Sequence, residues 1–126
     1  VADLLNRIRP PFNVNTLAQI AACAALEDSA HLQRSIAVNA AGLRQLAHGF
    51  ERLGLDAIPS AGNFISVDLA QEAHPLYTAL LRRGVIVRPI GGYGMPRHLR
   101  VSVGTEAQNG RLLEALASCL QQNTQG

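Results

Sequence analysis

The stretches GVIVRP (residues 84–89) and LRVSVGT (residues 99–105) decide the fold that we predict for this chain. Each is a short apolar run of the kind that forms a β-strand, and each carries one arginine, Arg88 or Arg100. A loop rich in Gly and Pro joins the two runs. An arginine inside an apolar strand costs free energy unless an anion pairs with it. The two strands therefore indicate a pocket that binds a carboxylate or a phosphate.

Strand alternation places Arg100 on the face opposite Leu99 and Val101. A guanidinium binds a carboxylate through two parallel hydrogen bonds, and side chains at strand ends, such as Arg88, often line pockets. Spacing alone leaves open a second interpretation, in which both are surface arginines at a sheet edge. We expect His98 to face away from Arg100 and to be exposed or to cap a turn.

The composition limits the classes of function. A chain of 126 residues is long enough for one domain with its own core. The net charge is +2, and the 11 basic residues, all of them arginine, are spread along the chain, so neither nucleic acid nor a membrane surface is an expected partner. No apolar run approaches the roughly 20 residues that cross a bilayer.

The two cysteines and the first residue suggest the protein's setting. Cys23 and Cys119 fall on Ala- and Leu-rich helical stretches, so we expect two buried, reduced thiols in a cytoplasmic protein. The chain starts at Val1, without Met or a signal-like segment, and enters a helical pattern at once. We expect it to be a piece of a longer protein.

Helix and strand patterns alternate along the chain in an order typical of an α/β fold. We predict helices near residues 1–9, 16–28, 29–53, 75–83 and 105–121, and strands near residues 55–58, 63–69, 85–88 and 99–103. They form a two-layer sandwich of helices on a small, mostly antiparallel sheet, preceded by N-terminal helices.

Local signals mark the ends of these elements. Pro10-Pro11 ends the first helix, Asn15 or Thr16 caps the second, and Ser29 caps the third. Thr105 and Gln108 resemble a capping box, and the polar tail after Gln121 is expected to fray.

Other motifs that could carry chemistry are weak. The run GGYG at residues 91–94 lacks the strand–loop–helix context of a phosphate loop, and we interpret it as a turn that could act as a lid. The four histidines have no metal-ligand spacing. No serine has a nucleophile-elbow motif around it, so no catalytic or metal-binding residue is predicted.

Five segments together resemble histidinol-phosphate aminotransferases, a branch of the fold-type I pyridoxal-phosphate enzymes. They occur in that family's order and at its spacing, and they cover nearly the whole chain. LRVSVGT alone would indicate only the broader superfamily. The segments are RIRPPFNVN (7–15), SAGNF (60–64), GVIVRP (84–89), LRVSVGT (99–105) and the last helix with Asn109, Arg111 and Leu116.

The resemblance implies roughly the C-terminal third of a homodimeric, cytoplasmic enzyme of the aspartate-aminotransferase-like fold. Residues 1–29 would end the large domain and connect it to a small domain at residues 30–126. The arginine matching Arg100 binds the substrate α-carboxylate, and the one matching Arg88 helps to hold the phosphate of histidinol phosphate. Arg9 and Asn13 match a loop that reaches the neighbouring subunit's site.

The chain departs from that family in having no lysine. The family's enzymes need a lysine that binds pyridoxal phosphate covalently, and their cofactor-binding groups precede the segment matching Val1. The chain would therefore supply anion recognition, with its own large domain and a small phosphorylated or amino substrate as partners. Two alternatives stay open: part of a threonine-phosphate decarboxylase-like lyase, or a stand-alone anion-binding or regulatory α/β module.

Overall fold

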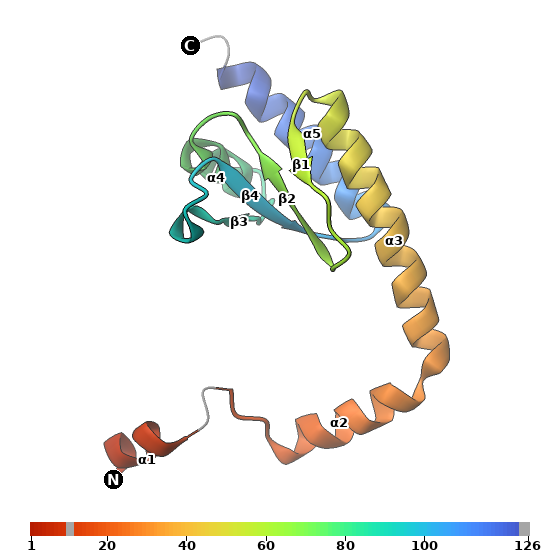
Figure 1. Ribbon diagram of the computed structural model, residues 1–126, viewed down its shortest axis with the longest axis vertical. Coiled ribbons are helices and arrows are strands. Elements are labelled where there is room, and N and C mark those ends of the chain that lie inside the picture. The colour runs from red at the N-terminus through yellow and green to blue at the C-terminus, as the bar shows by residue number, and fades with distance from the viewer. Residues whose placement is uncertain (10–11, 124–126) are drawn as a thin grey trace. The chain divides into compact units, whose positions relative to one another are not determined.

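The computed structural model describes residues 1–9 and 12–123 (Figure 1). These residues divide into two compact units, Val1–Ser35 and the residues from Ile36 onward. Unit 1 contains α1 (Ala2–Ile8), α2 (Thr16–Glu27) and the start of α3 (Ser29–Arg52). The predicted helix end at Pro10-Pro11 and the last three residues of the tail lie outside the described residues.

Unit 2 is the α/β part of the chain. Its elements, after the rest of α3, are β1 (Asp56–Ile58), β2 (Phe64–Asp68), α4 (Ala73–Arg82), β3 (Arg88–Pro89), the 3₁₀ turn η1 (Gly91–Tyr93), β4 (His98–Ser102) and α5 (Glu106–Asn123). Helix α5 thus runs two residues past its predicted end.

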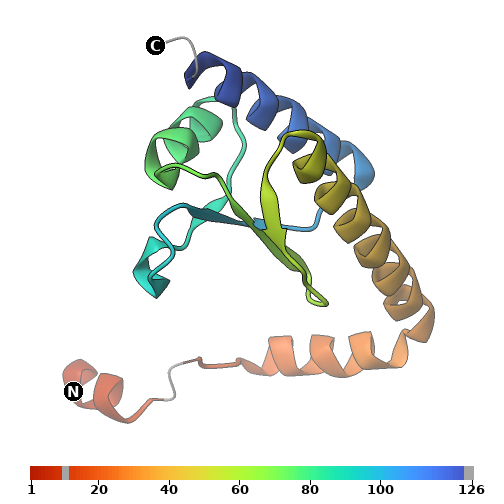
Figure 2. The ribbon, with the colours of Figure 1, turned by 45° about the horizontal axis from the view of Figure 1, so that its top comes forward.

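The four strands form one sheet in the order β1-β2-β4-β3, and every neighbouring pair is antiparallel. Helices α3, α4 and α5 lie together on one side of it (Figure 2). The predicted two-layer sandwich on an antiparallel sheet is confirmed.

The strand predicted at residues 85–88 is wrong in its extent. The Val85 N–H donates to the Leu80 carbonyl, which completes the end of α4 instead of starting a ladder. The Ile86 side chain is 84% exposed. The chain reaches β4 only at Arg88, so β3 has two residues.

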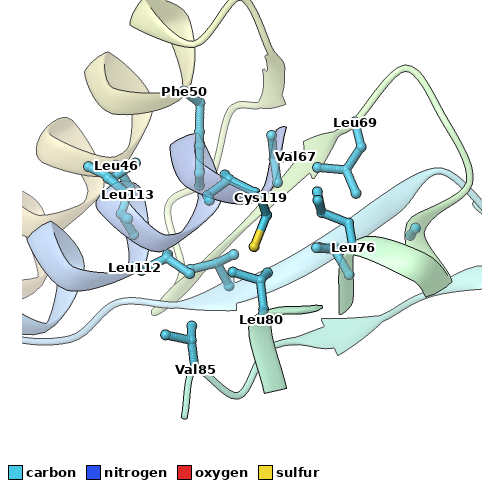
Figure 3. Packing of buried hydrophobic residues seen from close by; sticks show 14 of the residues in the cluster. Leu46, Phe50, Val67, Leu69, Leu76, Leu80, Val85, Leu112, Leu113 and Cys119 are labelled. Atoms are coloured by element: carbon cyan, nitrogen blue, oxygen red, sulfur yellow. The ribbon is translucent and has the colours of Figure 1, made fainter. Parts of the chain in front are cut away.

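The core lies between the sheet and the three helices (Figure 3). Alternate residues of β2 and β4 point into it, as the burial pattern of both strands shows, and α3, α4 and α5 each contribute an apolar stripe. The side chains with at most 4% exposure from these elements include Ile65, Val67, Leu99, Val101, Leu46, Phe50, Leu76, Leu80 and Leu116.

Polar side chains cap three helices, two of them at the predicted residues. The Asn15 side chain accepts the Ala18 N–H at 2.9 Å. The Thr105 N–H donates to Gln108 Oε1 at 2.9 Å, and the Gln108 N–H donates to Thr105 Oγ1 at 3.4 Å, which confirms the capping box. Helix α3 is capped one residue earlier than predicted: Asp28, not Ser29, accepts the His31 N–H.

Unit 1 has no core of its own. All of its described residues are exposed, including Leu4, Leu17 and Ile20. The prediction that Cys23 is buried is therefore wrong, whereas Cys119 is buried, and both thiols are free. An Ala- and Leu-rich pattern predicts a helix, but only contacts with another element decide which of its residues become buried.

Helix α3 carries glycines where it meets Val103, in the turn before α5, and Leu113 on α5. A Cβ at Gly42 would lie 2.4 Å from Val103 Cγ1, and a Cβ at Gly49 would lie 2.4 Å from Leu113 Cδ1. Real Cβ atoms do not tolerate such distances in a packed interior. A side chain at either position would therefore force its neighbour to move.

Asn109 connects this helix pair to the turn that follows β4. Its side chain is buried, accepts the Gly104 N–H at 2.9 Å, and donates to Gln45 Oε1 on α3 at 3.0 Å. A buried amide satisfied in this way specifies one arrangement of the groups around it. Asn109 thus fixes the end of β4 against α3.

Asp68 anchors the other end of the sheet. Its carboxylate accepts hydrogen bonds from the Arg97 guanidinium and from the Ala70 N–H, the latter at 2.8 Å. Ala70 has φ of 55°, which is unusual for a residue other than glycine. The Arg97 and Ala70 hydrogen bonds lower the pKa of the Asp68 carboxyl below its ordinary value. The end of β2 is thus tied to the segment that leads into β4.

We expect Gly42→Ala to destabilise the protein, because the added methyl collides with Val103. Overpacking a core costs about 1–3 kcal/mol. Gly110→Ala on α5 is the matched control, since nothing lies within 4 Å of a Cβ there, and better helix propensity should raise stability by up to about 1 kcal/mol. Thermal unfolding of both variants measures the difference. Equal shifts for the two would contradict the packing argument.

We expect Asp68→Asn to lower the unfolding midpoint at pH 7. Because the folded-state pKa of Asp68 lies below the ordinary 3.8, its contribution is present above that value and disappears as pH falls through the lowered pKa. The gap between wild type and variant should therefore narrow between about pH 5 and pH 3. Glu114→Gln, which removes one negative charge from an exposed position on α5, should leave the midpoint unchanged. A pH-independent gap would show that Asp68 acts through packing.

Candidate functional site

Arg88 and Arg100 lie directly opposite each other on β3 and β4. Opposite residues of an antiparallel pair project from the same face, with Cβ atoms about 5 Å apart. Leu99 and Val101 occupy the core face of β4, so both arginines project from the face opposite α3, α4 and α5. Arg100 is half-buried and Arg88 is exposed.

Neither guanidinium has a hydrogen-bond or ion-pair partner among residues 1–9 and 12–123. The carboxylate on the same face, Asp68, is bound by Arg97 instead. Like charges directly across a strand pair are destabilising, so an anion between the two arginines would relieve the repulsion. The donors of two guanidiniums suit a carboxylate or a phosphate.

Phe64 is a member of the site that the sequence reasoning missed. The Arg100 Cζ lies 5.0 Å from the centroid of its ring, within range of a cation–π contact. Alternation along β2 would have placed Phe64 on the same face as Ser66. The register that brings Phe64 beside Arg100, however, cannot be derived from the pattern of one strand.

His98 shares the face of Arg100, so the prediction that it faces away is wrong. The two residues are two positions apart, and strand side chains repeat with a period of two. His98 Nε2 lies 4.0 Å from the Asp68 carboxylate, and Nδ1 is buried without a hydrogen-bond partner in the described part of the chain.

Arg9 and Asn13 belong to unit 1, whereas the two arginines of the sheet belong to unit 2. Arg9 follows the last turn of α1, and Asn13 lies in the segment before α2. Both are exposed. Their predicted role at a neighbouring subunit stays a prediction.

The loop between β3 and β4 is the turn that was predicted. Gly91–Tyr93 forms a single 3₁₀ turn, and Gly94 follows in the left-handed region with φ of 78°. No helix begins there, so the loop lacks the aligned N–H groups of a phosphate cradle.

The two guanidiniums of the arrangement offer hydrogen-bond donors to an anion. The chain has no lysine, and the described residues contain no cluster of His, Cys, Asp and Glu that could hold a metal ion. None of the described helices is both long and apolar enough to span a membrane.

Comparison with known proteins identifies the family. The family model of aminotransferase class I and II matches residues 1–116. Histidinol-phosphate aminotransferase 2 of Pseudomonas fluorescens is 61% identical over 120 residues, which cover 95% of this chain and 32% of that protein. The enzyme of the same name from Pseudomonas aeruginosa is 60% identical with the same coverage. The chain thus spans about a third of the length of these relatives.

A solved structure shows the same fold. The histidinol-phosphate aminotransferase of Sinorhizobium meliloti, in complex with pyridoxal-5′-phosphate, superposes with a TM-score of 0.81 at 26% identity. The match covers 97% of this chain and 34% of that one. The resemblance drawn from the five sequence segments is confirmed, and the chain belongs to the class I and II aminotransferases.

Proposed function

We propose that the full-length protein carrying this chain is a histidinol-phosphate aminotransferase, which transfers the amino group of histidinol phosphate to 2-oxoglutarate. The observation that carries the proposal is that Arg88 and Arg100 lie directly opposite on one sheet face, and neither guanidinium has a hydrogen-bond or ion-pair partner in the part of the chain that the structure describes. The names and the identity of the relatives support it.

The two arginines divide the recognition of the substrates. Arg100, half-buried and central in the sheet, binds the α-carboxylate of the oxo acid through its planar pair of donors. Arg88, exposed at the sheet edge, helps to hold the phosphate of histidinol phosphate. One substrate is a phosphate ester and the other a dicarboxylate, so a site with two adjacent cations meets the anionic group of each.

The residues of this chain cannot attach the family's cofactor covalently. Pyridoxal phosphate requires a lysine for attachment, and the chain has none. When bound, pyridoxal phosphate acts as an electron sink. The chain's own contribution is to bind and orient the substrate anions, with the anchoring lysine supplied by another part of the full-length enzyme.

Unit 1 supplies the contacts with the rest of the enzyme in this proposal. Residues 1–29 end the large domain and connect it to the small domain, and Arg9 and Asn13 reach the site of the second subunit in a homodimer. The full exposure of its apolar residues supports a docking role, because large exposed apolar patches mark interfaces. Two free cysteines fit a cytoplasmic location.

We expect Arg100→Gln in the full-length enzyme to lower kcat/KM for 2-oxoglutarate by roughly 10- to 150-fold, the loss of about 1.5–3 kcal/mol for a hydrogen bond to a charged group. Arg100→Lys should recover only part, since an ammonium cannot reproduce the forked geometry. Steady-state kinetics with both substrates measures this. Full activity of Arg100→Lys would contradict the carboxylate role.

Arg44→Gln is the matched control, because Arg44 is an exposed arginine on α3. Its kinetic constants should equal those of the wild type. The same assay with threonine phosphate separates the alternative function, since release of CO₂ from that compound would identify a decarboxylase and contradict the proposed transamination.

We expect borohydride reduction of the full-length enzyme to link the cofactor permanently to a lysine that lies outside residues 1–126. Reduction makes a lysine–cofactor link permanent, and residues 1–126 contain no lysine. Digestion and mass spectrometry should find the modified peptide elsewhere in the enzyme. A modified peptide within residues 1–126, or transamination by the isolated chain, would contradict the division of labour.

A further inference from the structure

The ring of Phe64 contacts the Arg100 guanidinium across the sheet. Register pairs Phe64 with Ser102 and Ser66 with Arg100, so Phe64 is the diagonal neighbour of Arg100 on the same face. Aromatic and long side chains reach such diagonal neighbours. The distance of 5.0 Å from Arg100 Cζ to the ring centroid is that of a cation–π contact.

Arg100 thus has an attractive group on one side and a repulsive one on the other. Phe64 lies on the β2 side, and Arg88 lies directly across on β3. No carboxylate within the described ranges pairs with either arginine. Unlike a carboxylate, a ring does not neutralise the guanidinium, so Arg100 keeps its charge for an incoming anion.

We propose that Phe64 is a positioning residue for Arg100, whose ring holds the guanidinium toward β2 before the substrate anion arrives. A free arginine side chain samples many rotamers, and ordering it during binding costs affinity. The ring contact removes part of that cost in advance. The inference rests on the proposed function only in assigning the substrate carboxylate to Arg100.

The test uses the full-length enzyme with Phe64→Leu, which removes the ring but keeps an apolar side chain, and Phe64→Tyr, which keeps the ring. We expect Phe64→Leu to raise the KM for 2-oxoglutarate by about 2- to 5-fold, the range of an exposed cation–π contact, with kcat nearly unchanged. Phe64→Tyr should restore the wild-type KM. A general defect of the sheet would instead lower kcat for both substrates.

Ile58→Val is the matched control. Ile58 lies on β1 opposite Ser66, and its side chain is on the same face of the sheet as Phe64. Its KM should not change. If Phe64→Leu unfolds below the assay temperature, Phe64→Met replaces it, and thermal unfolding of each variant shows that the folded enzyme is compared.

A double-mutant cycle with Arg100→Gln decides the mechanism. When the guanidinium is absent, Phe64→Leu should have no further effect on KM. Additive effects of the two substitutions on KM would overturn the role of Phe64. A wild-type KM for Phe64→Leu, with a raised KM for Arg100→Gln, would do the same and would leave the role of Arg100 intact. An unchanged KM in Arg100→Gln would instead overturn the carboxylate assignment, so the two failures are distinguishable.

Discussion

The antiparallel pairing of β2 with β4 is the constraint on which the rest of unit 2 depends. Its register places Ile65 opposite Val101 and Val67 opposite Leu99, so the apolar members of both strands enter one core. The same register leaves the alternate residues, Arg100 among them, on the other face. Because strand side chains repeat every two residues, a slip of β4 by one residue would bury Arg100 and expose Leu99 and Val101. Folding and anion recognition are therefore specified by one set of hydrogen bonds.

Close helix packing and a few polar side chains support that register. Gly42 and Gly49 let α3 approach α5, and Asn109 connects the turn after β4 to Gln45 on α3. At the opposite end of the sheet, Asp68 fixes the segment before β4 through Arg97. The strand that carries Arg100 is thus anchored at both ends by polar side chains. A rigid strand presents its functional side chain in one place, which binding sites require.

Much of this arrangement follows from local patterns. Apolar periodicity and caps predicted the helices, and the Thr105–Gln108 box is formed as expected. Other features did not follow, and three of them show why. Residues 85–87 are β-branched, but the Val85 N–H donates to the Leu80 carbonyl at the end of α4, and pairing with β4 begins only at Arg88. Cys23 lies on an apolar helix that buries nothing within this chain. Phe64 meets Arg100 only through the pairing of distant strands, information that no single segment contains.

Both edge strands of the sheet are short, which limits edge-to-edge aggregation of the protein. β3 has two residues, one of them Pro89, which has no N–H to offer a further strand. β1 has three residues and begins with a charged Asp56. Long, flat edges invite other chains to add strands and aggregate, whereas brevity, proline and charge discourage this. The edge that carries Arg88 can therefore stay open to small anions and still be a poor template for another polypeptide.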